Sequence, residues 1–386
     1  MDEMVAFLAL GLRSHGLRAA VLLTPTTPQQ AVKDRLAPVL SAAGIEVAVA
    51  QKADAKRWIR RWAPDVISAH DAPSWVLDEA RTMAVPYVDV LHGHSLLSCD
   101  WATEAERSRD IRAVVAVSET TRRRYLRGVP TFPSERIVTI PNGVHHQRRV
   151  PHDRLAARSA LGLKDEFLFV SLGRLDANKN QFGLISAFDE VAARHPDTHL
   201  LNAGPAHQLD YAAQVRQAWT RLPARDRIHL RGHHPDPALL LAAADGFVLN
   251  SFLEGGPLVT MEALHAGVPV VAADVGNVRD QLGTDPSRGY LIRNPLGDSL
   301  EVNWSTIRSA CYATQTNRDE LIEAMCALVR EREQRAAKRE ELAAESAERF
   351  HPDHCLRGHA SLLRSCVTGR IVSQDPSGDA RACARA

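Results

Sequence analysis

Two glutamates flank a glycine-rich turn in the stretch that reads NSFLEGGPLVTMEALHAGVPVVAAD from residue 250. Gly255 and Gly256 have no side chains, so backbone N–H groups there can approach a ligand closely. A helix that begins after Pro257 would direct the positive end of its dipole at a phosphate. Glu254 precedes the turn and Glu262 lies about one and a half turns into that helix. Both carboxylates could therefore accept hydrogen bonds from the hydroxyls of one extended ligand.

A second stretch, VSLGRLDANKNQ from residue 170, places two cations after a predicted strand. Gly173 lets the chain turn off the strand, and Arg174 and Lys179 then present positive charge where a diphosphate would lie. Taken alone, these cations are typical of a solvated surface, and so is the pair of glutamates. The two stretches together favour a site that binds a diphosphate with sugars on either side.

The two stretches resemble the donor-binding signatures of retaining nucleotide-sugar glycosyltransferases of the family-4 type. The first is similar to the Glu-x7-Glu region of that family and the second to its strand–Gly-Arg–loop–Lys signature. Further family-like marks follow in the same order, over roughly residues 1–365: PDVISAHD, VDVLHGH, VVAVSE, IPNGV, NAGP, LRGHHPD, AADGFVLNS and GYLIRNPLGD. The resemblance implies an α/β protein of two facing Rossmann-like, doubly wound domains, the GT-B architecture. Its active site would lie in the cleft between them.

The resemblance assigns roles to the donor-side residues. Arg174 and Lys179 would neutralise the donor diphosphate, including the charge that builds up as the nucleotide leaves. Glu254 would hydrogen-bond the donor sugar, and Glu262 the hydroxyls of the ribose. The remaining donor-binding positions would frame the sugar with backbone or lie near the base: Gly173, Gly232, His233, Gly255, Gly256, Pro257 and Leu258.

On the acceptor side, the resemblance singles out His92 in a Leu-His-Gly-His turn. His92 would lie under the sugar at the domain interface and act with the catalytic residues Arg174, Lys179 and Glu254. It could donate a hydrogen bond to a sugar hydroxyl or carry positive charge. His94 is a second candidate, and a structural role for either histidine stays open. Ser118 is better interpreted as a helix N-cap than as a substrate contact.

The reaction implied by the resemblance is glycosyl transfer with retention of anomeric configuration. The leaving diphosphate would deprotonate the incoming hydroxyl on the same face of the sugar, so no protein nucleophile is needed. No Asp-x-Asp pair is present to hold a divalent ion. We therefore expect no metal site and no cofactor beyond the nucleotide-sugar co-substrate.

Alternating strand and helix patterns predict parallel sheets covered by helices. The expected parts are an acceptor-side domain over 1–150, a donor-binding domain over 151–350, a helix over 351–368 that packs back on the first domain, and a disordered tail over 369–386. The polar and basic stretch His145–Leu163 reads as a linker. The first domain lacks the opening strand and glycine loop typical of the family. Asn277 stands where the family often has a second glycine.

The composition is that of a globular protein without a dedicated nucleic-acid function. The 386 residues carry 47 basic and 46 acidic side chains, whereas nucleic-acid binders are normally plainly basic. No apolar run of about 18 residues predicts a spanning helix, and the acidic start is unlike a secretory signal. The six cysteines lack zinc or disulfide spacing, so we expect a cytoplasmic protein. The oligomeric state is not indicated.

Two arginine-rich helices raise the question of a membrane. One contains Arg57, Arg60 and Arg61, and the other contains Arg122–Arg124 and Arg127. Such charge could draw the protein to the anionic inner face of a membrane, or it could bind an anionic acceptor. A solvated arginine-rich surface is the commoner interpretation.

The sequence therefore predicts a retaining glycosyltransferase that moves a sugar from a nucleotide-diphosphate sugar to an acceptor hydroxyl, in glycoconjugate or cell-envelope glycan synthesis. One alternative is transfer to a small polar metabolite such as an aminocyclitol. Another is an inactive binding or regulatory homologue. A nucleotide-sugar epimerase is less favoured, because no set of carboxylates suits acid–base work on the sugar. The sugar, the nucleotide, the acceptor and the linkage stay open.

Overall fold

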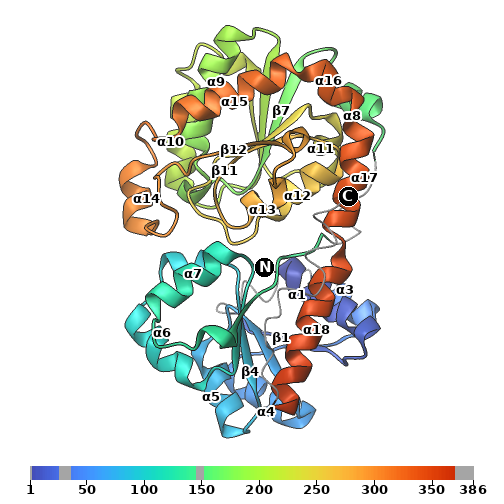
Figure 1. The fold of residues 1–386 in the computed structure, drawn as a ribbon, viewed down its shortest axis with the longest axis vertical. Helices are drawn as coiled ribbons and strands as arrows, with labels where there is room; N and C mark the ends of the chain where they lie inside the picture. The colour runs from blue at the N-terminus through green and yellow to red at the C-terminus, as the bar shows by residue number, and fades with distance from the viewer. Residues whose placement is uncertain (1, 26–35, 145–151, 370–386) are drawn as a thin grey trace. The chain divides into compact units, whose positions relative to one another are not determined.

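The computed structural model describes residues 2–25, 36–144 and 152–369. The chain forms two compact units: unit 1 comprises Met1–Ser95, Cys99–Pro141 and Asp353–Ala386, and unit 2 comprises Leu96–Ser98 and Asn142–Pro352. All described strand pairs in both units are parallel, and helices cover the sheets (Figure 1). The predicted α/β class with two Rossmann-like domains is confirmed. The predicted boundary at residue 150 and nearly all of the predicted tail lie outside the described residues.

The sheet of unit 2 is built from strands that are apolar on both faces. β7 (Phe167–Leu172), β10 (Gly246–Leu249) and β11 (Val270–Ala273) read FLFVSL, GFVL and VVAA, and nearly all of these residues are buried. Such runs are typical of parallel strands covered by helices on both faces. The other strands are β8 (Thr198–Ala203), β9 (Ile228–Arg231) and β12 (Gly289–Ile292).

Helices connect these strands and extend to the end of unit 2. They are α8 (Arg154–Ala160), α9 (Gln181–Arg194), α10 (Leu209–Trp219), α11 (Pro237–Ala243), α12 (Leu258–His265), α13 (Val278–Leu282), α14 (Trp304–Ala310), α15 (Arg318–Arg330), α16 (Arg332–Ala337) and α17 (Arg339–Arg349), with short 3₁₀ turns η6 (Ala177–Lys179), η7 (Arg225–Arg227) and η8 (Pro286–Arg288).

The strand order of unit 2 creates a topological switch point. The order is β12-β11-β10-β7-β8-β9, so the chain runs outward from β7 to β9 and then returns to place β10 on the other side of β7. The connections that leave β7 and β10 therefore diverge to opposite sides of the sheet. In open parallel sheets, ligands bind beyond the carboxyl ends of the two strands at such a point.

Unit 1 contains two parallel sheets. β1 (Ala20–Leu23) pairs with β2 (Glu46–Val49), and a second sheet has the order β3-β4-β5-β6, with β3 (Ile67–His70), β4 (Tyr87–Leu91), β5 (Ala113–Ala116) and β6 (Ile137–Thr139). The helices are α1 (Asp2–Gly11), α3 (Leu36–Ala42), α4 (Lys52–Trp62), α5 (Ser74–Thr82), α6 (Trp101–Arg107) and α7 (Glu119–Gly128), with 3₁₀ turns η1 (Leu12–His15), η2 (His94–Leu97), η3 (Ser108–Asp110) and η4 (Ser134–Arg136).

The helix α18 (Pro352–Thr368) follows α17 in the chain but, from Asp353 onward, belongs to unit 1 (Figure 1). It buries an apolar face that includes Leu356 and Leu363. A Cβ at Gly11 would lie 2.5 Å from the Leu356 side chain, so α1 and α18 approach closely where the glycine leaves room. The Nε2 atom of His15 also lies 3.0 Å from Asp353 Oδ1. Unit 1 is thus completed by the end of the described chain.

Part of the predicted linker is wrong, because α8 occupies its second half. Asp153 caps this helix by accepting a hydrogen bond from Ala156 N at 2.7 Å. The basic residues that suggested a solvated linker have internal partners: Arg154 Nη2 lies 2.6 Å from Asp245 Oδ1, and Arg158 Nη1 lies 3.0 Å from Asp245 Oδ2. Asp245, more than 80 positions away in the chain, thus attaches α8 to unit 2, and the local sequence pattern does not reveal this contact.

Candidate functional site

The loops that follow β7 and β10 are joined by a buried asparagine at the switch point. Asn178, 2% exposed, donates from Nδ2 to Leu253 O at 2.9 Å and accepts from Leu253 N through Oδ1 at 3.0 Å. Phe252 N donates to Asn178 O at 2.8 Å. These three bonds fix two segments 75 residues apart in one register. Asn178 could not be singled out from the sequence, because its partners are backbone atoms of a distant loop.

This junction brings Lys179 and Glu254 together. Lys179 Nζ lies 2.6 Å from Glu254 Oε1, and the two side chains are 19% and 12% exposed. Asp176 caps the turn η6 and accepts a hydrogen bond from Lys179 N at 3.2 Å, which sets the direction of the lysine. A cation and a carboxylate that both reach the surface at the switch point are suited to a ligand that carries phosphate and hydroxyl groups.

Arg174 lies on the same loop and keeps much of its guanidinium exposed. Its Nη2 atom is 3.4 Å from Asp176 Oδ2, and its carbonyl accepts from Gln181 Nε2 at 2.7 Å. Gly173 turns the chain here beside Gly204, where a Cβ would lie 1.9 Å from Gly173 O. Gly204 is therefore required at the end of β8 for Arg174 to leave the sheet as it does. Gly204 belongs to the NAGP mark of the sequence, which was not assigned to the site.

The Gly-Gly-Pro turn before α12 packs against the segment from Gly276 to Gln281. Gly276 has φ +56°, and a Cβ on it would lie 2.3 Å from Gly255 O. Gln281 Nε2 donates to Pro257 O at 3.1 Å and to Asn277 Oδ1 at 2.8 Å. Asn277, noted as a departure from the family pattern, thus helps to hold the turn. These contacts present the turn rigidly at the start of α12.

One residue expected on the acceptor side instead contacts the donor turn. Asn142, in the stretch IPNGV, donates from Nδ2 to Gly256 O at 3.1 Å and belongs to unit 2. The assignment of this stretch to the acceptor half is therefore corrected for Asn142. Asn142 was assigned to the first domain because of its position in the chain. Its hydrogen bond, however, is with Gly256, more than a hundred positions later.

The other predicted donor residues lie at the same edge of the sheet with different exposures. Glu262 is only 4% exposed on α12, so most of its carboxylate is covered. Leu258 begins α12 and is partly exposed. Gly232 and His233 follow β9 and are exposed, and Gly204 N donates to Gly232 O at 3.1 Å. The structure thus brings Lys179 and Glu254 into contact and places Arg174 on the same loop as Lys179. Gly232 and His233 follow β9, two strands away from β7.

In unit 1, His92 is paired with a second histidine. His70 ends β3 and His92 follows β4, and His70 Nδ1 lies 2.9 Å from His92 Nε2. The rings are stacked with centroids 5.1 Å apart. Burial lowers the pKa of His92 to about 3 and holds the pKa of His70 well below its usual value. Both rings are therefore neutral at pH 7, so one ring donates and the other accepts.

Two further predictions in unit 1 are decided by local contacts. Ser118 accepts a hydrogen bond from Thr121 N at 3.1 Å, which confirms the N-cap interpretation. His94 is exposed at the start of η2.

Arginines of the two arginine-rich helices have partners within unit 1. Arg60 pairs with the buried Glu79, and Arg122 pairs with Glu119 at 3.3 Å. Membrane contact stays a prediction, and no helix in the described ranges is long and apolar enough to cross a membrane.

Comparison with known protein families covers most of the chain. Residues 2–148 match the family described as "Glycosyltransferase Family 4", and residues 153–302 match "Glycosyl transferases group 1". The donor-side residues from Gly173 to Glu262 all fall within the second match. His70 and His92 fall within the first match.

Curated relatives match over shorter stretches. The D-inositol 3-phosphate glycosyltransferase of Geodermatophilus obscurus is 34% identical over 155 residues, 37% of this chain and 34% of that protein. The glycogen synthase of Mycobacterium tuberculosis is 29% identical over 239 residues, 57% of this chain and 54% of that protein. The chain thus spans about half or less of the length of these relatives.

Among solved structures, Anabaena HepE in complex with UDP and glucose has a similar fold. The TM-score is 0.69 at 21% sequence identity, over 94% of this chain and 95% of that one. The likeness extends over both units and bears out the predicted GT-B fold. The predicted location of the active site in a cleft between the units stays a prediction.

Proposed function

We propose, from the premise that this chain belongs to the family-4-type nucleotide-sugar glycosyltransferases, that it transfers a sugar from a nucleoside-diphosphate sugar to an acceptor hydroxyl with retention of configuration. The observation that carries the proposal is the contact of 2.6 Å between Lys179 Nζ and Glu254 Oε1 at the switch point of unit 2. The stretches that contain these residues resemble the family's donor-binding signatures.

The Lys179–Glu254 pair suits a site whose two members separate when the donor binds. Lys179, with Arg174, would turn to the diphosphate, and Glu254 would then accept hydrogen bonds from the sugar hydroxyls. Both charges lie at the switch point, because each side chain is partly exposed and Lys179 ends a turn that Asp176 caps. The charge on the diphosphate grows as the glycosidic bond breaks, so the cations stabilise the transition state more than the ground state.

The proposed step balances without a protein nucleophile. The bond between the anomeric carbon and the diphosphate oxygen breaks, and a bond from the acceptor oxygen to the same carbon forms on the same face. The acceptor proton passes to the leaving diphosphate. Neutral His92, with its ring held by His70, would hydrogen-bond the sugar from unit 1.

The test is nucleotide release from a panel of donors. The purified chain is incubated with UDP-, GDP-, ADP- and dTDP-linked sugars, and free nucleotide is measured with and without acceptors. We expect slow hydrolysis of one donor alone and faster turnover with acceptor, unaffected by EDTA. Proton NMR of the product then reports whether the anomeric configuration is retained. No release from any donor, together with no donor binding by calorimetry, would favour the inactive binding homologue.

The acceptor class has two candidates. Glycan synthesis is the prediction from the sequence, and the similarity to a D-inositol 3-phosphate glycosyltransferase favours a phosphorylated cyclitol as the second. Faster nucleotide release with inositol phosphate than with sugars or lipid-linked glycans would select the cyclitol. The reverse order would select glycan synthesis.

A further inference from the structure

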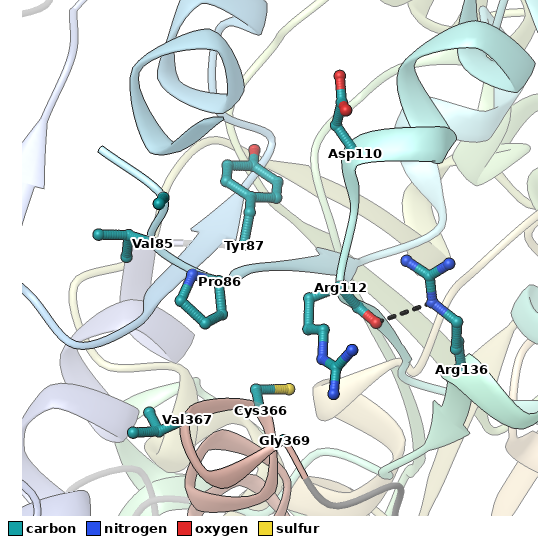
Figure 2. A pocket seen from close by; sticks show the side chains of 10 residues that line it. Val85, Pro86, Tyr87, Asp110, Arg112, Arg136, Cys366, Val367 and Gly369 are labelled. Carbon is teal, nitrogen blue, oxygen red and sulfur yellow. Dashed lines mark hydrogen bonds between the residues drawn. The ribbon is translucent and has the colours of Figure 1, made fainter. Parts of the chain in front are cut away.

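A hollow lies at the amino-terminal edge of the four-stranded sheet of unit 1 (Figure 2). It has a volume of about 410 Å³. Tyr87 begins β4 beside it, Arg112 precedes β5, and Arg136 precedes β6. His70 and His92 lie at the carboxyl ends of β3 and β4, the opposite edge of the same sheet. The hollow is therefore separate from the histidine pair to which the proposed function assigns a role.

Two arginines give this hollow its charge. The Arg112 side chain forms no hydrogen bond or ion pair with any residue that the structure describes. Arg136 donates from Nε to Arg112 O at 3.0 Å and lies over the Phe132 ring at 5.2 Å, so its terminal nitrogens stay available. In Figure 2 the Arg112 guanidinium extends toward Cys366.

The single carboxylate of the lining does not neutralise these arginines. Asp110 Oδ2 is 3.1 Å from Arg81 Nη1, and Figure 2 shows the Asp110 carboxylate directed away from Arg112. The pKa of Arg136 is lowered, chiefly by burial and then by the positive charge of Arg112. An anion between the two guanidiniums would remove this repulsion, and planar guanidiniums bind phosphate oxygens through paired hydrogen bonds.

The remaining walls and the size of the hollow limit what the anion can be. Val85, Pro86 and Val367 provide apolar surface, and Val367 is 47% exposed. The volume is many times the roughly 30 Å³ that one water occupies in the liquid, so an inorganic ion alone would leave most of it unfilled. We propose that this hollow binds a phosphate group that carries an organic substituent, with Arg112 and Arg136 on the phosphate and the apolar wall on the substituent.

The phosphate could belong to a soluble phosphorylated metabolite or to a lipid headgroup. Glycerol 3-phosphate and phosphatidic acid present the same phosphomonoester from the two sources. Calorimetry with glycerol 3-phosphate tests the first, and co-flotation with phosphatidylcholine vesicles with and without phosphatidic acid tests the second. The full chain is used in both experiments.

Arg112→Gln is the main variant, because the Arg112 side chain has no hydrogen bond or ion pair to lose among the described residues. Arg136→Gln is the second, and Arg109→Gln, an exposed arginine of η3 outside the lining, is the matched control. Arg174→Gln reports phosphate that binds at the donor site instead. We expect glycerol 3-phosphate or phosphatidic acid to bind about tenfold or more weakly to Arg112→Gln. Binding should be unchanged in Arg109→Gln and Arg174→Gln, and nucleotide release should be unchanged in Arg112→Gln.

Three results would overturn the site. They are no binding of either probe by the wild-type chain, wild-type affinity for the probes in both Arg112→Gln and Arg136→Gln, or a loss of probe binding only in Arg174→Gln. Loss of glycerol 3-phosphate binding in Arg112→Gln identifies a soluble ligand, and loss of co-flotation alone identifies a lipid. Because donor turnover is measured separately, failure of the proposed transferase would not be mistaken for failure of this site.

Discussion

Single side chains at the donor site combine a charge with a fixed direction. Lys179 and Glu254 contact each other at 2.6 Å, and each stands on a turn held by backbone hydrogen bonds. The pair is partly exposed, so its own contribution to stability is small, about 1 kcal/mol or less. In the proposed mechanism, the Lys179–Glu254 pair keeps two opposite charges at one place. A ligand with both phosphate and hydroxyl groups would then replace the contact between them.

Removing either charge should therefore affect turnover much more than folding. We expect Lys179→Met and Glu254→Gln each to lower kcat by about 100- to 1,000-fold, because one group that stabilises developing charge or orients the sugar is lost. The unfolding midpoint in urea should change little. Lys164→Met, at an exposed lysine of the same unit, is the control. Wild-type turnover in either variant would refute the assigned site.

His70 should act through His92. His70 Nδ1 and His92 Nε2 share one hydrogen bond at 2.9 Å, which orients the His92 ring and couples its tautomer to that of His70. We expect His70→Phe to lower kcat by about tenfold with a smaller change in the donor KM, and His70→Asn, whose amide can reach the same atom, to restore part of it. Nitrogen-15 NMR should show one His92 tautomer in the wild type and a mixture in His70→Phe. A single, unchanged tautomer in that variant would contradict this role.

At the scale of elements, the loops after β7 and β10 would form the proposed site only together. The chain leaves β7 toward one side of the sheet and returns at β10, so no local sequence relation links the two loops. Buried asparagines provide the link instead. Asn178 binds the Leu253 backbone, and Asn180 Nδ2 donates to Asn250 O at 3.1 Å. These hydrogen bonds hold the two loops together and so keep Lys179 and Glu254 in contact.

Asn178→Ala should loosen this link and weaken donor binding. It leaves the buried N–H and C=O of Leu253 unpaired, at a cost of about 2–3 kcal/mol in unfolding free energy. Asn303→Ala, which removes the N-cap of α14, should cost about 1 kcal/mol without changing donor affinity. Urea titration and calorimetry with the donor nucleotide separate the two effects. Equal donor affinities in both variants would show that the link is structural only.

Gly276→Ala should disrupt the turn at Gly255. The new Cβ would lie 2.3 Å from Gly255 O, in addition to the strain of φ +56°. Gly162→Ala is the matched control, because Gly162 has φ +72° but no atom within 4 Å of the added Cβ. We expect Gly162→Ala to cost about 1 kcal/mol of stability and to keep full turnover. Gly276→Ala should lose most donor binding, and full donor binding there would contradict the supporting role.

At the scale of the whole chain, unit 1 is completed by a helix that follows all of unit 2. α18 packs with α1 through Leu356 and Gly11 and buries His359 near His70 and His92. Burial lowers the pKa of His359 to about 4 and the pKa of His92 to about 3. In the unfolded chain both histidines protonate near pH 6.5, so the unfolded state binds more protons below that value.

Acidification should therefore destabilise the protein between pH 6.5 and about 4. At pH 5.5 His92 and His359 each remove about 1.4 kcal/mol relative to pH 7.5. His70, whose pKa burial also lowers, adds to this loss, so we expect at least about 3 kcal/mol in total. Urea unfolding followed by circular dichroism at the two pH values measures the loss. His359→Gln should lose about 1.4 kcal/mol less than the wild type over the same range. Equal stability at pH 7.5 and 5.5 would show that the cluster titrates normally.

The α/β class and most strand positions could be predicted from the sequence, because they depend on local patterns of period and composition. The residues of the proposed donor site came from the resemblance to the family and stay a prediction. Tertiary structure decided what those patterns could not contain. Asp245 pairs with the arginines of α8 in the expected linker, Asn178 joins two distant loops, and Asn142 contacts the Gly-Gly-Pro turn. Each of these outcomes depends on a hydrogen bond or ion pair between residues far apart in the chain, and such a partner exists only once the strands have taken their order in the sheet.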